Sequence, residues 1–258
     1  VAADRGPEVT MDPIAVPTLD IENLTIAYQP EAGTLLAVRN ATLAIKKGES
    51  FGLVGESGSG KTTLALGAIR YLAANGRIAG GQVRLQGQNL TETPWRDLFN
   101  IWGKRIGMVY QNPGSALNPS LTIGRQISEA AVIHQGLTKK EGLRKAVDML
   151  GKVAMPNPET VINLYPHQLS GGMLQRCVIA MGLINDPELL IMDEPTTALD
   201  VTTQALVLDL VSDLKTQFES SILYITHDLA VVARICDRIG VMYAGEMVEI
   251  GPKREMFF

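Results

Sequence analysis

Residues 169–176 are Leu169-Ser170-Gly171-Gly172-Met173-Leu174-Gln175-Arg176, and the segments on either side of them indicate the fold. Upstream, Gly55-Glu56-Ser57-Gly58-Ser59-Gly60-Lys61-Thr62 fills every fixed position of the phosphate-binding pattern G-x-x-x-x-G-K-[ST]. Downstream, Leu189-Leu190-Ile191-Met192-Asp193-Glu194 is an apolar run that ends in two carboxylates. Many nucleotide-binding proteins contain these two outer elements. A Ser-Gly-Gly segment that opens a helix between them is much rarer.

Length and composition favour a globular α/β protein. The chain has 258 residues, of which 46% are hydrophobic and 19% charged, so it can bury a sizeable core. A net charge of −4 argues against a surface that coats nucleic acid. No apolar run approaches the roughly 20 residues that cross a bilayer, and no secretory leader opens the sequence. If the protein serves a membrane, we expect it to do so from the cytoplasmic side through a partner.

Short apolar runs alternate with helical segments, which predicts a mostly parallel sheet with helices on its faces. Residues 1–17 show no period and predict a flexible tail. Residues 19–26 predict an edge strand. The helical segments from 113 to about 175, broken by glycines and prolines, predict an inserted helical subdomain. Further strands are expected at 38–45, 51–54, 82–85, 106–110, 189–192, 222–225 and 240–243, and a helix at 63–72. Cys177 and Cys236 lie in apolar helical contexts, which favours buried, reduced thiols over a disulfide.

Three polar clusters each follow directly after a short apolar strand. They are residues 55–62, the pair Asp193-Glu194 and the pair His227-Asp228. Since the carboxyl ends of parallel strands meet at one edge of a sheet, and open α/β sheets bind ligands there, we expect the three clusters to converge on one crevice.

The phosphate loop carries the most specific chemistry. Gly55, Gly58 and Gly60 let the backbone curl around an anion, so that peptide N–H groups and the following helix N-terminus hold the phosphates. Lys61 supplies a positive charge for the β- and γ-phosphates, and the Thr62 hydroxyl is placed to ligate Mg²⁺. The nucleotide-binding residues expected in this segment are Gly55, Glu56, Ser57, Gly58, Ser59, Gly60, Lys61, Thr62 and Thr63. Ser170, Gly171 and Gly172 form a second helix N-terminus open to an anion.

From about Leu19 to Gly251 these segments resemble the ATP-binding cassette (ABC) ATPase. The resemblance implies a P-loop NTPase (RecA-like) α/β core over residues 18–258, with an antiparallel β subdomain at its edge and the inserted helical subdomain. ATP and Mg²⁺ are the implied cofactors. By the same resemblance, Glu194 polarises the attacking water, His227 contacts the γ-phosphate, and Gln111 reaches the metal and the water. The resemblance further implies that Asp193 holds the metal with Thr62, that Tyr28 stacks on adenine, and that Ala198-Leu199-Asp200 connects two cassettes.

Cassettes of this family pair head to tail around two ATP molecules, so Ser170–Gly172 is expected to serve the nucleotide of a second copy. Residues 111–119, 165–168 and 193–202 resemble the dipeptide, oligopeptide and nickel importer branch. That branch implies a non-identical second ATPase, two transmembrane permease subunits and an extracytoplasmic binding protein, with this chain on the cytoplasmic face of the membrane. Members usually continue beyond the position of Phe258, which suggests a longer natural chain.

Three alternatives remain open at this point. Met173-Leu174-Gln175-Arg176 also suits importers of nickel or metal chelates. A soluble ABC protein acting on nucleic acid or ribosomes would carry fused cassettes or a charged linker, and neither is present in this sequence. A regulatory cassette without activity would lack Lys61, Glu194 or His227, and all three are present.

Overall fold

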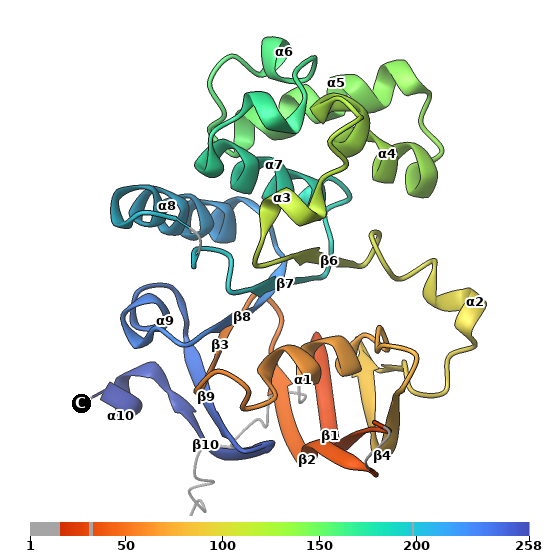
Figure 1. Cartoon of the computed structure of the whole chain (residues 1–258), viewed down its shortest axis with the longest axis vertical. Helices are drawn as coiled ribbons and strands as arrows, with labels where there is room; N and C mark the ends of the chain where they lie inside the picture. Colours follow the sequence, from red (N-terminus) through yellow and green to blue (C-terminus); the bar gives the residue numbers. More distant parts are fainter. Residues whose placement is uncertain (1–15, 31–32, 198, 258) are drawn as a thin grey trace, which may run out of the picture.

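The computed structural model describes residues 16–30, 33–197 and 199–257, and two β-sheets and a group of helices account for most of them (Figure 1). The four-stranded sheet has the order β2-β1-β4-β5, and the six-stranded sheet has the order β10-β9-β3-β8-β7-β6. The strands are β1 (Leu19–Tyr28), β2 (Leu35–Ile45), β3 (Ser50–Val54), β4 (Gly76–Leu85), β5 (Gln88–Asn89), β6 (Ile106–Val109), β7 (Leu189–Asp193), β8 (Ser221–Thr226), β9 (Arg238–Tyr243) and β10 (Glu246–Pro252).

The helices are α1 (Lys61–Ala68), α2 (Trp95–Leu98), α3 (Pro113–Ala116), α4 (Ile123–Gln135), α5 (Lys139–Lys152), α6 (Pro158–Val161), the 3₁₀ turn η1 (Pro166–Gln168), α7 (Gly171–Leu183), α8 (Val201–Gln217), α9 (Leu229–Ile235) and α10 (Lys253–Phe257). Helices α3 to α7 follow one another without an intervening strand of a sheet and form the green layer in Figure 1. These helices occupy the stretch of sequence in which we expect the helical insertion.

The six-stranded sheet is the parallel core that the sequence predicts. β3 pairs in parallel with β8 and β9, and β7 pairs in parallel with β6 and β8, whereas β10 joins β9 in antiparallel register. Residues of β3, β7 and β8 are buried without exception, because layers cover both faces of the sheet.

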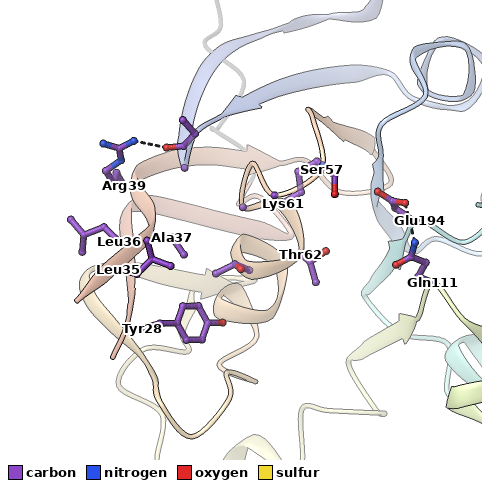
Figure 2. Close-up of a pocket in the computed structure, with 15 residues that line it drawn as sticks. Tyr28, Leu35, Leu36, Ala37, Arg39, Ser57, Lys61, Thr62, Gln111 and Glu194 are labelled. Atoms are coloured by element: carbon purple, nitrogen blue, oxygen red, sulfur yellow. Dashed lines mark hydrogen bonds between the residues drawn. The ribbon is translucent and has the colours of Figure 1, made fainter. Parts of the chain in front are cut away.

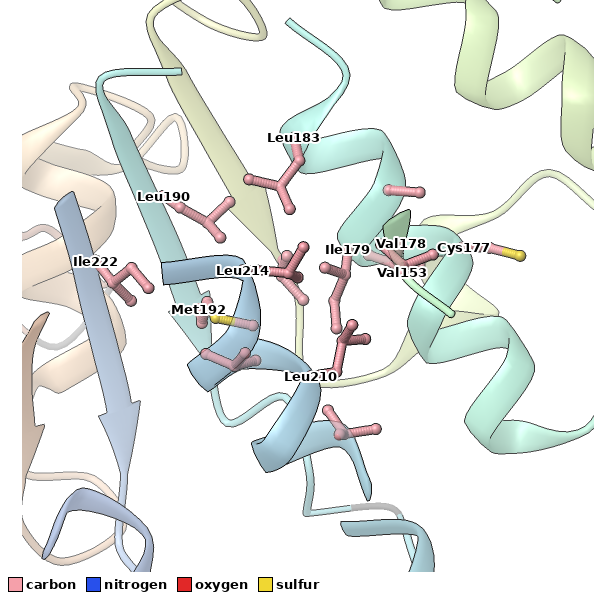
Figure 3. Close-up of a cluster of buried hydrophobic side chains, with 14 of the residues drawn as sticks. Val153, Cys177, Val178, Ile179, Leu183, Leu190, Met192, Leu210, Leu214 and Ile222 are labelled. Atoms are coloured by element: carbon pink, nitrogen blue, oxygen red, sulfur yellow. The ribbon is translucent and has the colours of Figure 1, made fainter. Parts of the chain in front are cut away.

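Side chains alternate between the two faces of this sheet. Ile191 and Leu223 pack toward α1 and the four-stranded sheet, while Leu190, Met192 and Ile222 pack toward α7 and α8. Figure 3 shows the second of these layers, where side chains of α7 and α8 meet those of β7 and β8. Because the same strands end in the polar clusters, the two apolar layers fix the position of the site.

The prediction of an edge strand at residues 19–26 is wrong. β1 lies between β2 and β4 and pairs in antiparallel register with both. The strand expected at 82–85 is longer than predicted, because β4 begins at Gly76 and continues through Gly80 and Gly81. A Cβ at Gly81 would lie 2.3 Å from the Asn23 carbonyl oxygen, where the register between the two strands shifts. The glycine therefore marks a β-bulge and a close backbone approach, not a strand end.

The first helix ends four residues earlier than predicted. Arg70 has a φ of 57°, and the Arg70 and Tyr71 N–H groups donate to the Gly67 and Leu66 carbonyls in a Schellman arrangement. The guanidinium of Arg70 donates to the Leu90 carbonyl at 2.9 Å and to that of Thr93, which holds a non-glycine residue in this conformation. Sequence reasoning had no glycine to mark this end.

The sequence also predicts buried, reduced cysteines and a flexible N-terminal tail. Cys177 and Cys236 are both free and buried, as predicted, and burial raises the pKa of each thiol to about 12. Residues 1–15 of the predicted tail lie outside the described residues. Within the described part of the chain, every helix is too short or too polar to span a bilayer.

Candidate active site

The phosphate loop connects β3 to α1. Neighbouring backbone atoms leave no room for a Cβ at two of its positions, so glycine is required there. Gly55 and Gly60 have φ angles of 157° and 103°. A Cβ at Gly55 would lie 2.2 Å from the Met242 carbonyl oxygen, and one at Gly60 would lie 2.6 Å from that of Ala37. No side chain caps the start of α1. The loop therefore leaves the N–H groups of the helix N-terminus available to an anion.

Lys61 is folded back over the loop that precedes it. Its Nζ donates to the carbonyl oxygens of Gly55 and Glu56, each at 2.8 Å, and the side chain is buried. Burial lowers the pKa of Lys61, and the carboxylates of Glu194 and Asp193 partly offset this effect. The ammonium is thus already oriented by neutral carbonyls, which compete less with an incoming phosphate than a carboxylate would.

A cavity of about 640 Å³ opens directly above the loop (Figure 2). The four-stranded sheet forms one wall, where Tyr28 ends β1 and Leu35, Leu36 and Ala37 begin β2. Gln111 and Glu194 face the loop from the opposite side. The loop residues that line it are Ser57, Gly58, Gly60, Lys61, Thr62 and Thr63, and the wall also includes Arg39, Ala244 and Gly245.

Two oxygen-bearing side chains meet next to this cavity, Thr62 on its lining and Asp193 in contact with Thr62. The Thr62 hydroxyl donates to Asp193 Oδ1 at 3.0 Å, which joins the start of α1 to the end of β7. Burial raises the pKa of the Asp193 carboxyl, and Glu194 adds to this effect, while the Thr62 hydrogen bond and Lys61 oppose it. A hydroxyl next to a desolvated carboxylate suits a hard cation such as Mg²⁺, which binds through one or two protein oxygens together with phosphates.

Glu194 is the centre of the polar network. Its carboxylate accepts hydrogen bonds from Gln111 Nε2 at 3.3 Å and from the Thr197 hydroxyl at 3.0 Å, and His227 Nδ1 lies 3.1 Å from its other oxygen. The backbone of Glu194 has a φ of 44°, and its N–H donates to the Ile225 carbonyl at 2.9 Å. This left-handed conformation is uncommon for a residue with a side chain and turns the carboxylate toward Gln111 and His227.

The three strand-end clusters therefore converge, as the sequence predicts. His227 does not line the nucleotide-sized cavity itself. It lies with Glu194, Gln111, Gly55 and Glu56 along an adjoining hollow of about 850 Å³. Glu194 and Gln111 line both hollows, so they stand where the two meet.

Six predicted site residues are absent from the described lining of both hollows: Ser59, Asp193, Ser170, Gly171, Gly172 and Asp200. Ser170 caps α7, Asp200 caps α8, and Gly171 and Gly172 open α7. The Asp200 carboxylate accepts hydrogen bonds from the N–H and the hydroxyl of Thr203, at 3.0 and 2.6 Å. A Cβ at Gly172 would lie 2.6 Å from Thr203 Cγ2, so packing against α8 already requires a glycine there. Ala198, the first residue of this predicted connecting segment, lies outside the described residues.

Sequence reasoning missed several residues of the site. Thr197 holds Glu194 but belongs to a run of two threonines that carries no pattern of its own. Arg39, Ala244 and Gly245 reach the cavity from β2 and from the turn between β9 and β10. Only the Ala-Gly pair between two apolar runs could have indicated that turn.

The fold and the site together define a nucleotide-binding cassette of the P-loop class. A parallel core ends in a phosphate loop, a buried Asp193 beside Thr62, and a Glu194 held by Gln111 and His227.

Comparison with known proteins places the chain within this class. Residues 38–197 match the family model of the ABC transporter. The oligopeptide transport ATP-binding protein OppD of Salmonella typhimurium is 43% identical over 240 residues, which are 93% of this chain and 71% of that protein. The dipeptide transport ATP-binding protein DppD of Bacillus subtilis is 42% identical over 241 residues, which are 93% of this chain and 72% of that protein. Among solved structures, the dimeric cassette MJ0796 in a post-hydrolysis state with ADP and Pi has a TM-score of 0.80 at 27% identity, covering 92% of this chain and 99% of that one.

The chain belongs to the ABC transporter family, as an ATP-binding cassette with ATPase activity.

Proposed function

We propose that this chain is the ATP-hydrolysing subunit of an importer for di- or oligopeptides. The network around Glu194 carries the catalytic part of the proposal, because it combines a fixed carboxylate with two polar neighbours at the edge of a phosphate-binding cavity. The cargo follows from the relatives named as oligopeptide and dipeptide transport ATP-binding proteins, of which this chain covers more than two thirds.

Within the cavity, Tyr28 would stack on the adenine, and the phosphates would lie on the N-terminus of α1 and on Lys61. Glu194 would accept a proton from the water that attacks the γ-phosphorus, while His227 and Gln111 hold the carboxylate and contact the γ-phosphate end. Water is then the nucleophile, the bond to the β,γ-bridging oxygen breaks, and ADP and phosphate leave.

Magnesium fits the oxygen atoms next to the cavity. Thr62 and Asp193 would hold the ion, with Gln111 within the same opening. When bound, Mg²⁺ neutralises charge that develops on the phosphate oxygens. Asp193 is buried and desolvated in the described structure, and a cation would relieve the cost of its charge.

A second cassette would complete the site. Ser170, Gly171 and Gly172 form a helix N-terminus, of the kind that can bind phosphate, at which the Ser170 hydroxyl accepts from the Met173 N–H at 3.4 Å, yet they do not line the cavity of their own chain. Head-to-tail pairing would bring this segment, with Asp200 beside it, onto the ATP of the neighbouring cassette. We further propose that the second cassette is a different chain, as in importers that pair two non-identical ATPases.

Two permease subunits would dock beside the helical layer, which places this chain at the cytoplasmic face of the membrane and links it to an extracytoplasmic substrate-binding protein. A groove of about 290 Å³ lies next to Gln111, lined by Tyr71, Trp102, Met108, Tyr110 and Ala116 among others. Its lining is mostly apolar, which would suit side chains on one face of a partner's helix. Because Gln111 touches Glu194 and follows Tyr110 directly, a change at the nucleotide would reach this groove.

Isolation of the complete complex tests this proposal. We expect the tagged chain to co-purify with a second cassette and two multi-span membrane proteins. The reconstituted complex should accumulate di- or oligopeptides in vesicles only when ATP and Mg²⁺ are supplied on the side that carries this chain. Recovery of ribosomes or nucleic acid in place of membrane proteins would overturn the assignment of this chain to an importer. Uptake of nickel without peptide would retain the mechanism and reverse the assignment of cargo.

A further inference from the structure

The turn between β9 and β10 lies against the phosphate loop. Tyr243 pairs with Glu246, and the two residues between them, Ala244 and Gly245, have φ angles of 46° and 87°. Positive φ at both central positions is the requirement of a type I′ hairpin turn. The Gly245 N–H donates to the Ser59 carbonyl oxygen at 2.9 Å, so this turn fixes one peptide of the phosphate loop from outside.

Arg39 joins the same turn to the strand that forms the adenine side of the cavity. Its N–H donates to the Gly245 carbonyl at 2.7 Å, and its Nη2 donates to the Ala244 carbonyl at 2.5 Å (Figure 2). Its Nε lies 3.4 Å from the Glu246 carboxylate. Both carbonyls of the turn are therefore occupied by a single residue of β2.

The backbones of β2, the turn and the phosphate loop are closely packed at this contact. A Cβ at Gly245 would lie 2.9 Å from the Ala37 carbonyl oxygen, and the same oxygen limits Gly60 on the phosphate-loop side. Strand β2, the turn and the phosphate loop thus touch one another at backbone distance, and a shift of one moves the other two.

From these contacts we infer that Arg39 is a positioning residue for ATP: through Ala244, Gly245 and Ser59 it sets the phosphate loop relative to the adenine wall. This inference rests on the ATP site and not on the proposed cargo. Electrostatic attraction for phosphate is not the role we assign, because the neighbouring Glu246 balances the charge of Arg39. The guanidinium instead uses two planar edges, with Nη2 donating to the Ala244 carbonyl of the turn and Nε facing the Glu246 carboxylate directly after it, a geometry that lysine lacks.

Binding of two probes to the purified chain tests the role, with Mg·ATP and inorganic tripolyphosphate measured by calorimetry. Arg39→Ala should weaken both by a similar factor of about 10, because the turn that supports the phosphate loop keeps its hydrogen bond from the backbone N–H of residue 39 but loses the contacts of the guanidinium. Arg39→Lys should recover part of this loss. The matched control is Arg84→Ala, since Arg84 lies on β4 of the same sheet, forms ion pairs with Asp20 and Glu22 at 3.0 and 2.7 Å, and does not line the cavity. It should leave both affinities unchanged.

A double-mutant cycle separates positioning from direct contact. Gly245→Ala disturbs the turn without removing the guanidinium, so its effect should overlap with that of Arg39→Ala, and the double variant should lose less than the product of the two losses. Loss of ATP binding with unchanged tripolyphosphate binding would overturn the inference, as would unchanged binding of both probes or strictly multiplicative losses. If Gly245→Ala does not fold, the two-probe comparison on Arg39→Ala decides alone. Failure of wild-type protein to bind either probe would instead refute the ATP site itself.

Discussion

Glu194→Gln is expected to bind Mg·ATP normally and to hydrolyse it about 100 to 10,000 times more slowly than wild type, in the complete complex. The amide keeps the size of the side chain and can still accept a hydrogen bond from Thr197 or Gln111, but it cannot take a proton from water. The rate of phosphate release and the affinity for nucleotide, measured on the same preparation, separate an effect on hydrolysis from an effect on binding.

Glu188→Gln provides the control for this variant. Glu188 immediately precedes the same strand β7 at its opposite end, pairs with Arg105 at 2.6 Å, and does not line either hollow of the site. It should hydrolyse ATP at the wild-type rate. A wild-type rate in Glu194→Gln would remove Glu194 from the catalytic role.

Lys61→Ala is expected to reduce ATP affinity by about 10- to 100-fold, since a buried cation aimed at the phosphates is worth more than a neutral hydrogen bond. The loss should appear in the dissociation constant, in contrast to Glu194→Gln, where it appears in turnover. Removal of the ammonium also leaves the carbonyls of Gly55 and Glu56 without their donor.

Lys47→Ala is the matched lysine variant. Lys47 is exposed, pairs with Glu219 at 3.3 Å, and lies outside the cavity. Calorimetric titration should therefore give its wild-type affinity. Equal affinities of Lys61→Ala and Lys47→Ala would show that the phosphate loop does not bind ATP as proposed.

The sequence predicts the parts of the fold that depend on local pattern and strong apolar runs. The runs at 51–54, 189–192 and 222–225 are strands because both faces of a parallel sheet are buried, and the polar residues after them meet at one edge. That rule alone brings Lys61, Glu194 and His227 together before any coordinate is known.

Contacts between distant backbones could not be predicted in this way. The sequence predicts a strand only from residue 82, whereas β4 runs through Gly81, where a Cβ would lie 2.3 Å from the Asn23 carbonyl oxygen. Arg70 ends α1 in a left-handed conformation that only its hydrogen bonds to Leu90 and Thr93 make acceptable. The contribution of Arg39 depends on a turn more than 200 residues away in sequence, for which no local pattern exists.

The position of Ser170–Gly172 is the reason to propose that ATP is hydrolysed between two cassettes. These residues open α7 outside the cavity of their own chain, so under the proposed function they act on ATP only if a second cassette supplies the phosphate loop.

Light scattering on Glu194→Gln together with its partner cassette measures this most directly. Because the variant binds ATP without consuming it, addition of Mg·ATP should convert separate chains into a complex with the mass of two cassettes. Removal of ATP, or the variant Ser170→Arg, should prevent the conversion. Full-rate hydrolysis by the wild-type chain at a dilution where its mass remains that of one cassette would contradict the shared site.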